Sequence, residues 1–329
     1  MPETGLPNRV LCLGEALIDR LGPPGGDPAM DQPVEDRLGG APANVACALA
    51  QLGTPSAFLG RLGSDAIGAS FRTLFAERGV DQRGLQRDAE RPSRTVLVRR
   101  DRSGERVFQG FAGDRGIGFA DQALEAETLA EVWPQLGTAA PWLLIGTIPL
   151  ATPQSARALH CAVDLAQAQG TSIALDVNWR PTFWDPSADP ASGPTTQALE
   201  AIQPLLEQAA LIKLAREEAL WLFQTDDPAA VVAGLPQQPA VVITNGAQPV
   251  RCCIKHEVIS IDALKPPQVV DTTGAGDAFT AGLLHRWAAP VPERLRFAAA
   301  CGALVCGGAG GIDPQPTQED VLTFLGSVS

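Results

Sequence analysis

The segment 271–282 (DTTGAGDAFTAG) combines a loop of small residues with the first turn of a predicted amphipathic helix. Consecutive backbone amides at a helix N-terminus bind an anion without any cationic side chain. Gly274, Ala275 and Gly276 would supply such amides. Asp277 follows them, where a carboxylate can take the proton of a hydroxyl that attacks a phosphate held by the same amides. The pattern alone fits equally well a glycine turn followed by an Asp that favours the helix dipole.

A second group of residues could bind a polar ligand. Gly39 and Gly40 precede a predicted helix and allow the backbone to come close to a ligand. Asn44, in the first turn of that helix, offers a hydroxyl both a donor and an acceptor. Asp19 follows the first predicted strand, at the strand end where open α/β sheets bind ligands. Taken alone, each feature also fits an ordinary polar loop.

The charge of the chain limits how it could hold an anion. The formal net charge is −12, and the lysines are Lys213, Lys255 and Lys265. An anionic ligand would therefore depend on backbone amides, helix N-termini, arginines or a metal. A nucleic-acid partner needs a basic patch and is not expected. The seven cysteines include no Cys-x-x-Cys pair, so we expect buried, reduced thiols rather than a zinc or thioredoxin-type site.

The motifs of several other functions are missing from the sequence. It has no Gly-x-x-x-x-Gly-Lys-Ser/Thr P-loop and no Gly-x-Ser-x-Gly elbow. Phe279 fills the place of the third glycine of a dinucleotide fingerprint, which argues against an NAD-dependent oxidoreductase. No apolar run reaches the ~20 residues that cross a bilayer, and the polar N-terminus does not resemble a secretory signal. We therefore expect a cytoplasmic protein without a membrane partner.

An α/β framework is predicted to position these residues. Apolar strand-like runs alternate with helical patterns, which is typical of a parallel sheet covered on both faces. Strands are expected at 9–14, 56–62, 142–145, 172–177, 211–214 and 241–244. Helices are expected at 43–53, 66–78, 153–169, 196–208, 216–223, 275–287, 293–306 and 318–324.

Two stretches break this alternation and predict a small β-sheet that acts as a lid. The first is rich in Gly, Pro and Asp, and the second contains a predicted hairpin of strands 95–100 and 105–111. We therefore expect a single domain over residues 1–329, with a lid formed by about 15–38 and 85–113.

Four motifs in chain order resemble those of the ribokinase-like (PfkB) carbohydrate kinases, and most of all the fructokinase branch of that family. They are GGAPAN (39–44), GRLGSDAIG (60–68), DVNWRPTFW (176–184) and DTTGAGDAFTAG (271–282). The similarity runs from about Arg9 to Thr317. It implies a ribokinase-like fold, with a doubly wound, mostly parallel sheet flanked by helices and a small lid.

The resemblance implies a role for each matching residue. Asp277 would be the general base, and the amides of Gly274, Ala275 and Gly276 would form the anion hole. Sugar hydroxyls would be bound by Asp19, Gly39, Gly40, Asn44, Asn178 and Arg180. The phosphates of ATP would lie along Lys213, Thr244 and Gly246, and Glu218 would help to organise Mg²⁺ through water. Asp271 and Thr273 would help to hold a monovalent cation, K⁺.

Three positions depart from the family pattern. Ala215 stands where an Asn-x-x-Glu motif usually has Asn, and Pro249 replaces the second glycine of the usual Thr-x-Gly-x-x-Gly loop. Ala299 stands where many relatives place an Asn near the adenine. None of these changes removes a catalytic group, and together they predict weaker nucleotide contacts or a changed nucleotide preference.

The implied reaction is phosphorylation of a ketose by MgATP, with D-fructose giving fructose 6-phosphate as the first choice. A 2-keto-3-deoxygluconate kinase or a ribokinase would share the anion loop. A non-catalytic sugar sensor would keep the pocket, but the intact Asp277 disfavours it. Asp277 is expected to need no raised pKa, because a carboxylate near its usual value of about 4 is ionised at pH 7. The lid is also a candidate interface for a homodimer.

Overall fold

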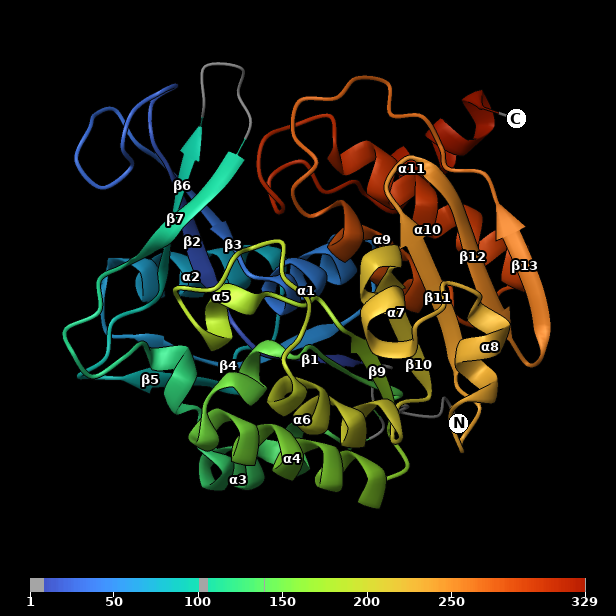
Figure 1. Ribbon diagram of the computed structural model, residues 1–329, viewed down its shortest axis with the longest axis horizontal. Helices are drawn as coiled ribbons and strands as arrows, with labels where there is room; N and C mark the ends of the chain where they lie inside the picture. The colour runs from blue at the N-terminus through green and yellow to red at the C-terminus, as the bar shows by residue number, and fades with distance from the viewer. Residues whose placement is uncertain (1–8, 101–105, 139, 329) are drawn as a thin grey trace, which may run out of the picture.

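The computed structural model describes residues 9–100, 106–138 and 140–328. Within these residues, a main sheet of nine strands lies between two layers of helices, and a smaller sheet of four strands projects from one end (Figure 1). The main sheet has the order β13-β12-β11-β10-β9-β8-β1-β4-β5, and the small sheet has the order β3-β2-β6-β7. This arrangement confirms the predicted α/β fold with a lid, and the small sheet is called the lid below.

The main sheet is mostly parallel, as predicted. Its strands are β1 (Val10–Leu13), β4 (Ser56–Gly63), β5 (Leu85–Asp88), β8 (Trp142–Ile145), β9 (Ser172–Asp176), β10 (Leu211–Ala215), β11 (Ala240–Asn245), β12 (Gln248–Ile254) and β13 (Glu257–Ile261). The strands from β5 to β11 in sheet order pair in parallel. The pairs β11–β12 and β12–β13 are antiparallel.

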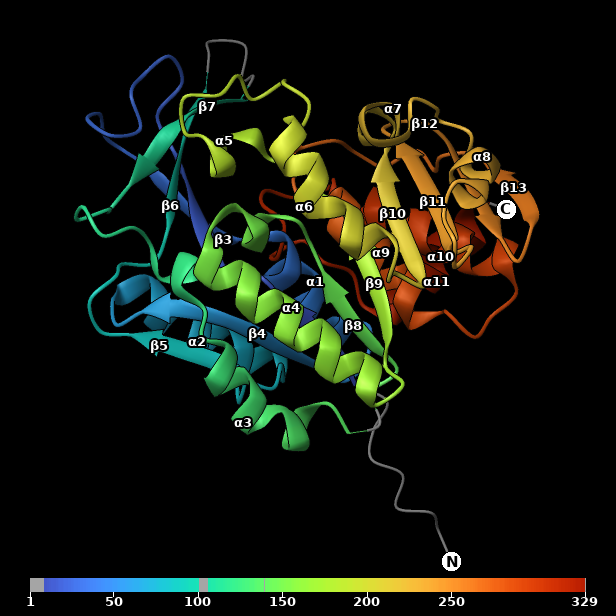
Figure 2. The same cartoon turned by 60° about the horizontal axis from the view of Figure 1, so that its bottom comes forward.

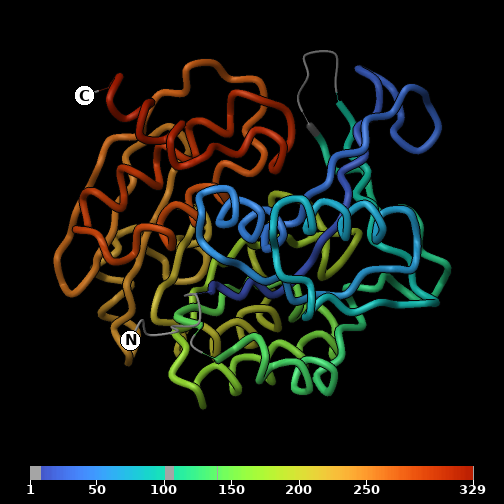
Figure 3. Tube along the Cα trace, turned by 180° about the vertical axis from the view of Figure 1, so that it is seen from behind, coloured from blue at the N-terminus to red at the C-terminus, as the bar shows by residue number. Residues whose placement is uncertain are grey.

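Helices cover both faces of the main sheet. One face carries α1 (Ala41–Gln51), α2 (Ala66–Arg78), α9 (Ala275–His285), α10 (Val291–Val305) and α11 (Gln318–Ser327). The other carries α3 (Ala126–Leu136), α4 (Pro153–Ala168), α6 (Thr196–Leu206), α7 (Arg216–Phe223) and α8 (Pro228–Ala233). Figure 2 looks onto the second face. Figure 3 shows α1 and α2 beside the C-terminal helices on the first.

Strand β1 lies between β8 and β4 and is buried on both faces. Val10 and Cys12 pack into the core beneath α1 and α9, whereas Leu11 and Leu13 pack into the core beneath α3 and α4. Such two-sided burial is typical of a central strand in a parallel sheet. Because the neighbouring strands run parallel, their carboxyl ends meet at one edge, where open α/β sheets bind ligands.

The lid consists of β2 (Leu17–Leu21), β3 (Glu35–Gly39), β6 (Thr95–Arg100) and β7 (Arg106–Ala112). β2 pairs antiparallel with β3 and parallel with β6, and β6 and β7 form the predicted hairpin. The turn of that hairpin lies outside the described residues.

The predicted start of the second lid segment, residue 85, is wrong. Strand β5 pairs in parallel with β4 and forms the edge of the main sheet. Its Gln86 is buried, and the side-chain amide of Gln86 bonds both the N–H and the carbonyl of Glu125. The lid therefore resumes only at Thr95. Three short helical elements complete the described structure. They are the 3₁₀ helices η1 (Ala120–Ala123) and η2 (Ile148–Ala151) and the helix α5 (Pro181–Trp184).

Two expectations from composition can be compared with the structure. All seven cysteines are free and six are buried, with Cys161 partly exposed, which confirms the prediction of unpaired, mostly buried thiols. Among the described residues, no helix combines the length and the apolar character that crossing a bilayer requires.

Candidate active site

The first and the last of the four motifs meet through one hydrogen bond. Asn44 on α1 donates its Nδ2–H to Oδ2 of Asp277 on α9, at 2.7 Å, across 233 positions of sequence. The bond identifies Nδ2 as the donor and leaves the Asn44 Oδ1 facing elsewhere. That Oδ1 is buried and has no hydrogen-bond partner among the described residues. A hydroxyl donor placed here would satisfy it, as the sequence predicted for Asn44.

Glycines at the start of both helices allow this approach. Gly40 has φ 101°, and a Cβ there would lie 2.6 Å from the carbonyl oxygen of Glu15. Gly274 has φ 78°, and its Cβ would lie 2.5 Å from Cα of Gly311. Each position therefore excludes a side chain on both conformational and steric grounds. The backbone of α9 consequently begins in direct contact with the loop that contains Gly311.

The pKa of Asp277 is raised to about 6, mainly because the surrounding protein desolvates its carboxylate. The hydrogen bond from Asn44 acts to lower this pKa, the charge of Asp176 raises it, and the charges of Lys213 and Arg180 lower it. The sequence analysis required no raised pKa for this base, and the structure raises it nonetheless. The sequence could not show how completely two helices and a loop would enclose this carboxylate. It remains mostly ionised at pH 7 and is a stronger base than an exposed Asp.

Lys213 of β10 supplies the cation of the site. Its Nζ lies 3.1 Å from Oδ1 of Asp176, and a Cβ at Gly276 would lie 3.1 Å from the same Nζ. Burial acts to lower the pKa of Lys213, but the charges of Asp176, Glu218 and Asp277 outweigh it and raise the pKa. A fixed ammonium therefore stands beside the first turn of α9, where anion binding was predicted.

Asp176 is a site residue that the sequence analysis did not single out. Its Oδ1 accepts from Lys213, and its Oδ2 accepts the hydroxyl of Thr280 at 2.9 Å. Asp176 is the last residue of β9 and is 5% exposed. Its place at the carboxyl end of a parallel strand was the signal that could have identified it.

Glu218 has two backbone partners. Its Oε1 accepts the N–H of Trp179 and its Oε2 accepts the N–H of Ala215, both at 2.7 Å. Burial raises the pKa of Glu218, and the charge of Lys213 acts to lower it. Glu218 thus joins the start of α7 to the segment after β9. Among the described residues, no group of three or more His, Cys, Asp or Glu could hold a metal by itself.

Asp271 and Thr273 brace the loop before α9. Oδ1 of Asp271 accepts both the N–H of Thr273 at 3.0 Å and its hydroxyl at 2.8 Å. Oδ2 of Asp271 accepts the N–H of Gly310 at 2.8 Å. One carboxylate therefore fixes two loops that meet at the anion-binding turn.

The predicted nucleotide residues lie along neighbouring strands. Thr244, near the end of β11, pairs in register with Ala215, two residues beyond Lys213 on β10. Gly246 follows in the turn to β12 with φ 53°, a backbone conformation that favours glycine. Pro249 lies in β12, and Ala299 is buried on α10. Thr244 and Gly246 therefore lie at the same edge of the sheet as Lys213.

The predicted sugar residues come from the lid and from the segment after β9. Asp19 belongs to β2 of the lid rather than to the end of β1, and a Cβ at Gly39 would lie 3.7 Å from its Oδ2. Asn178 has φ 43° and lines a cavity with Glu15 and Asp176. Arg180 is exposed, and its charge lowers the pKa of Asp277, so it faces the same region.

Glu15 is a second residue that the sequence analysis did not single out. It follows β1, is 3% exposed, and its Oε1 accepts the N–H of Ala41 at 3.0 Å. The N-cap of α1 is Gly40, which has no side chain, so this carboxyl serves the first turn of α1 instead. Burial, together with the charges of Asp121 and Asp277, raises the pKa of Glu15 to about 8.

This arrangement suits the transfer of a phosphoryl group to a hydroxyl. It places a basic carboxylate at the N-terminus of a helix whose first residues are small, next to a buried ammonium. The amides and the ammonium can stabilise charge on a phosphoryl group, and the carboxylate can accept the proton of the attacking hydroxyl.

Comparisons with known proteins agree with this chemistry. A model described as "pfkB family carbohydrate kinase" matches residues 7–318. A probable chloroplastic fructokinase-6 of Arabidopsis thaliana is 35% identical over 96% of this chain and 82% of its own. A fructokinase of Klebsiella pneumoniae is 32% identical over 96% of this chain and 99% of its own.

Solved structures of fructokinases also superpose on nearly the whole chain. A fructokinase from Xylella fastidiosa with bound ATP superposes with a TM-score of 0.82 at 29% identity, covering 98% of this chain and 99% of that one. A fructokinase from Vibrio cholerae O395, in its fructose-, ADP- and calcium-bound form, superposes with a TM-score of 0.80 at 28% identity. That match covers 97% of this chain and 99% of the other.

Proposed function

The chain belongs to the pfkB family of carbohydrate kinases, and on that premise we propose that it is an ATP-dependent fructokinase. The observation that carries the chemistry is the Asn44–Asp277 hydrogen bond, at the helix start that Lys213 also reaches. Fructose as the acceptor is supported by the relatives, which are named fructokinases and align over almost their whole length.

Asp277 is proposed as the general base. Its Oδ2 is held by Asn44 Nδ2, so Oδ1 is the oxygen that we assign to the proton of the attacking hydroxyl. Asn44 Oδ1 would accept a hydrogen bond from the sugar and keep the hydroxyl oriented toward phosphate. Orientation of this kind removes much of the entropic cost of bringing two reactants together.

The amides of Gly274, Ala275 and Gly276 are proposed to bind the phosphoryl group, together with Lys213. The open backbone of Gly276, whose nearest neighbour is the Lys213 ammonium, fits a phosphate. Thr244 and Gly246 would lie along the remaining phosphates of ATP. The three departures from the family pattern lie on this nucleotide side, so they bear on the choice of nucleotide more than on the acceptor.

A divalent ion would arrive with the nucleotide. The described residues offer no metal cluster of their own, and Mg²⁺ commonly binds through substrate phosphates, water and one or two carboxylates. Asp176 and Glu218 are the carboxylates beside Lys213, so we propose that they hold water molecules of that ion. When bound, the ion neutralises charge on the transferring group.

The sugar is proposed to lie between the lid and the carboxyl edge of the main sheet. Its hydroxyls would meet Asp19 and Gly39 from the lid, Gly40 and Asn44 from the start of α1, and Asn178 and Arg180 from the segment after β9. Asp271 and Thr273 are proposed to hold K⁺ beside the anion loop. We also propose a cytoplasmic enzyme, supported by its free cysteines, and a homodimer formed through the lid.

One assay tests the proposed function. ADP release should be coupled to a colour reaction and measured with fructose, ribose, 2-keto-3-deoxygluconate, adenosine and glucose as acceptors. We expect the highest kcat/KM with fructose. A preference for ribose or 2-keto-3-deoxygluconate would contradict the acceptor but keep the kinase, whereas no turnover with any of them would contradict the proposed function.

A further inference from the structure

The motif GRLGSDAIG at residues 60–68 has no role in the site described above. It spans the end of β4 and the first turn of α2, where Asp65 caps the helix by accepting the N–H of Gly68 at 2.8 Å. The same carboxylate accepts the N–H of Ser93 at 2.7 Å and its hydroxyl at 2.9 Å. A helix cap needs only the first of these bonds. The other two join the motif to Ser93, which lies two residues before lid strand β6.

The glycines of the motif make room for this junction. A Cβ at Gly63 would lie 2.6 Å from Oδ2 of Asp65 and 2.7 Å from the backbone nitrogen of Ser93. A Cβ at Gly68 would lie 2.1 Å from the carbonyl oxygen of Gly63. The N–H of Gly63 also donates to the Ser93 hydroxyl at 2.9 Å. The contacts between Asp65 and Ser93 therefore require a glycine at position 63, and the close approach of Gly63 requires one at position 68.

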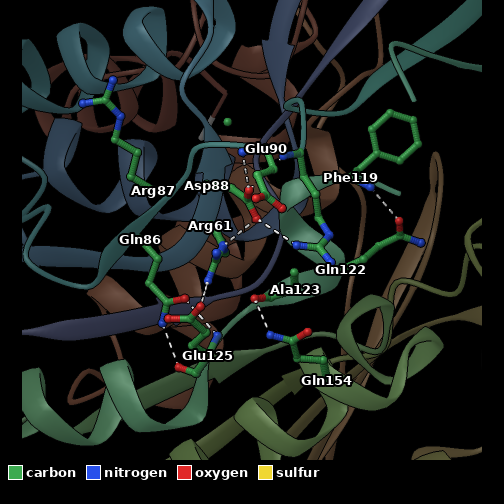
Figure 4. A network of polar contacts seen from close by, with 12 residues as sticks. Arg61, Gln86, Arg87, Asp88, Glu90, Phe119, Gln122, Ala123, Glu125 and Gln154 are labelled. Carbon is green, nitrogen blue, oxygen red and sulfur yellow. Dashed lines mark hydrogen bonds and ion pairs between the residues drawn. The ribbon is translucent and has the colours of Figure 1, made fainter. Parts of the chain in front are cut away.

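A second carboxylate holds the other end of the connection between β5 and β6. Asp88, at the end of β5, is 2% exposed and accepts the N–H groups of Glu90 and Arg91 at 2.9 and 2.8 Å. It also pairs with Nε of Arg61 on the neighbouring strand β4, at 3.0 Å (Figure 4). Residues 88–93 are thus fixed to the main sheet at both ends, which makes a rigid base for the lid.

This base connects to the proposed sugar site through the backbone. Arg94 follows Ser93, and its carbonyl accepts the N–H of Ile18 on β2 at 3.1 Å. Asp19 is the next residue of β2 and pairs in register with Val96 of β6. The Arg94 guanidinium is itself held by both oxygens of Asp121, at 2.8 and 3.1 Å. A shift of Ser93 would therefore move the strand that carries Asp19.

We propose that Asp65 is a positioning residue for sugar binding: it clamps Ser93 at the base of the lid and in this way sets the place of Asp19. This inference rests on the proposed function. Asp65 is linked to Asp19 through Ser93, Arg94 and Ile18 and is not among the residues proposed to bind the sugar or the phosphates. Its loss should therefore affect the sugar and leave the phosphoryl-transfer groups in place.

The test replaces Asp65 by a residue that caps the helix but cannot reach Ser93. Serine is about as good an N-cap as aspartate, and it has only one short oxygen. Asp65→Ser should raise KM for fructose about tenfold, because two buried bonds to a charged group are lost. We expect kcat and KM for ATP to stay within about twofold of the wild type. The melting temperature should fall, because the buried N–H of Ser93 is left without its partner.

Asp227→Ser is the matched control. Asp227 caps α8 by accepting the N–H of Ala229 at 3.1 Å, away from the lid. We expect this variant to keep the wild-type KM for both substrates. Ser93→Ala, which leaves the Asp65 cap intact, should raise KM for fructose in the same direction. The double variant Asp65→Ser/Ser93→Ala should raise KM for fructose by less than the product of the two single effects, because both changes break the bond between the Ser93 hydroxyl and Asp65.

The outcomes are distinguishable. An unchanged KM for fructose in Asp65→Ser overturns the inference, as does an equal loss in kcat or in KM for ATP. If Asp65→Ser fails to fold, Ser93→Ala decides alone, and a wild-type KM in that variant overturns the inference. Wild-type protein that phosphorylates none of the sugars contradicts the proposed function and the inference together, so that measurement comes first.

Discussion

Two groups of charged side chains, each built around a buried carboxylate, differ in how their charges balance. The site cluster lies at the carboxyl edge of the main sheet and combines four carboxylates with one ammonium, namely Glu15, Asp176, Glu218, Asp277 and Lys213. The pKa of Asp277 is raised to about 6, that of Glu15 to about 8, and that of Glu218 is also raised. Burial is the main cause in each case.

The base cluster lies under the lid and is balanced. It consists of Arg61, Asp88, Arg91 and Glu125. Figure 4 labels Arg61, Asp88 and Glu125. Burial acts to raise the pKa of Asp88, but amide hydrogen bonds and the two arginines lower it overall. The bond from Arg61 lowers the pKa of Glu125.

The difference shows that the charges proposed for catalysis and the charges that stabilise the fold lie in separate places in the molecule. In the base cluster, each charge finds its partner within the protein, so ionisation stabilises the fold. In the site cluster, the carboxylates exceed the cations, so ionisation costs folding energy but leaves a strong proton acceptor. Sites that work under such strain are commonly stabilised elsewhere in the structure.

The largest expected effect comes from removing the charge of Asp277. Asp277→Asn keeps the size of the side chain and its place in the first turn of α9, but it cannot accept a proton. We expect kcat to fall by about 10²–10⁴ with KM for ATP roughly preserved. Because an unfavourable charge is removed, the melting temperature should be equal to or above that of the wild type.

Asp320→Asn in the first turn of α11 is the control for this variant and should keep full activity. A folded Asp277→Asn protein that retained most of its kcat would falsify the role of Asp277. It would also remove the contrast between the two clusters, because the site cluster would then be structural as well.

The base cluster should show the opposite behaviour. Arg61→Met leaves the buried Asp88 without its partner on β4, and breaking such a pair typically costs about 3 kcal/mol or more. We expect that loss in the free energy of unfolding measured with urea, with kcat unchanged. Arg87→Met, which removes an exposed neighbour of Ser64, should change stability by less than about 0.5 kcal/mol. A loss of kcat with unchanged stability in Arg61→Met would reverse the comparison.

The pH dependence should separate the clusters further. Because Asp277 must be ionised to act, kcat/KM for fructose should fall about tenfold per pH unit below a pKa of about 6. Since its folded pKa is raised, Asp277 makes the fold less stable as pH rises from about 4 to about 6. Asp88 and Glu125 have lowered pKa values, so their contribution is present above about 4 and is lost at lower pH.

Urea unfolding of the wild type and of Asp277→Asn between pH 4 and 7 measures this difference. The wild type should lose stability relative to the variant as pH rises through that range. A difference that stayed constant with pH would show that the pKa of Asp277 is not raised in the folded protein.

The smallest expected effect concerns K⁺. Asp271 already braces Thr273 and Gly310, so a cation there would only refine the direction of the loop amides. Replacing K⁺ by tetramethylammonium at equal ionic strength should lower kcat a few-fold, with a smaller change in KM for fructose. An identical rate in both salts would eliminate the cation site and leave Asp271 as a structural brace.

Much of the framework was predictable because its signals are local. Helix α2 begins after the capping Asp65 and ends at Gly79 with φ 73°, and both signals stand in the sequence. Helix α7 has its predicted bounds, 216–223. The contact between the first and the last motif was implied by their common resemblance rather than by any local pattern.

The elements that were missed lacked such signals. The turn between β12 and β13 consists of Lys255 and His256 with φ 53° and 65°. A two-residue hairpin turn of type I′ needs positive φ at both positions, for which Asn-Gly is the usual sequence. Here the pairing of β12 with β13 imposes positive φ on a Lys and a His. The sequence therefore carried no local signal for this hairpin.

The grouping and the pKa values of the charged site residues could not be predicted from the sequence either. Glu15 and Asp176 are ordinary acidic residues at strand ends, and only the folded chain brings them near Lys213 and Asp277. The degree of burial, which raises the pKa of Asp277, depends on helices that are more than 200 positions apart. Sequence patterns can indicate the strand ends but not the depth at which their side chains lie.

The hydrogen bond between Asn44 and Asp277 has a consequence for synthesis of the chain on the ribosome. Strand β1, helix α1 and most of the main sheet leave the ribosome long before α9, which packs against α1. Until α9 arrives, α1 exposes an apolar face that includes Val45 and Leu49, together with the unpaired amide of Asn44. Contacts of such long sequence separation form late in folding. The proposed catalytic pair is therefore assembled only after α9 has been synthesised, and a nascent chain that stalls earlier exposes an apolar surface that promotes aggregation.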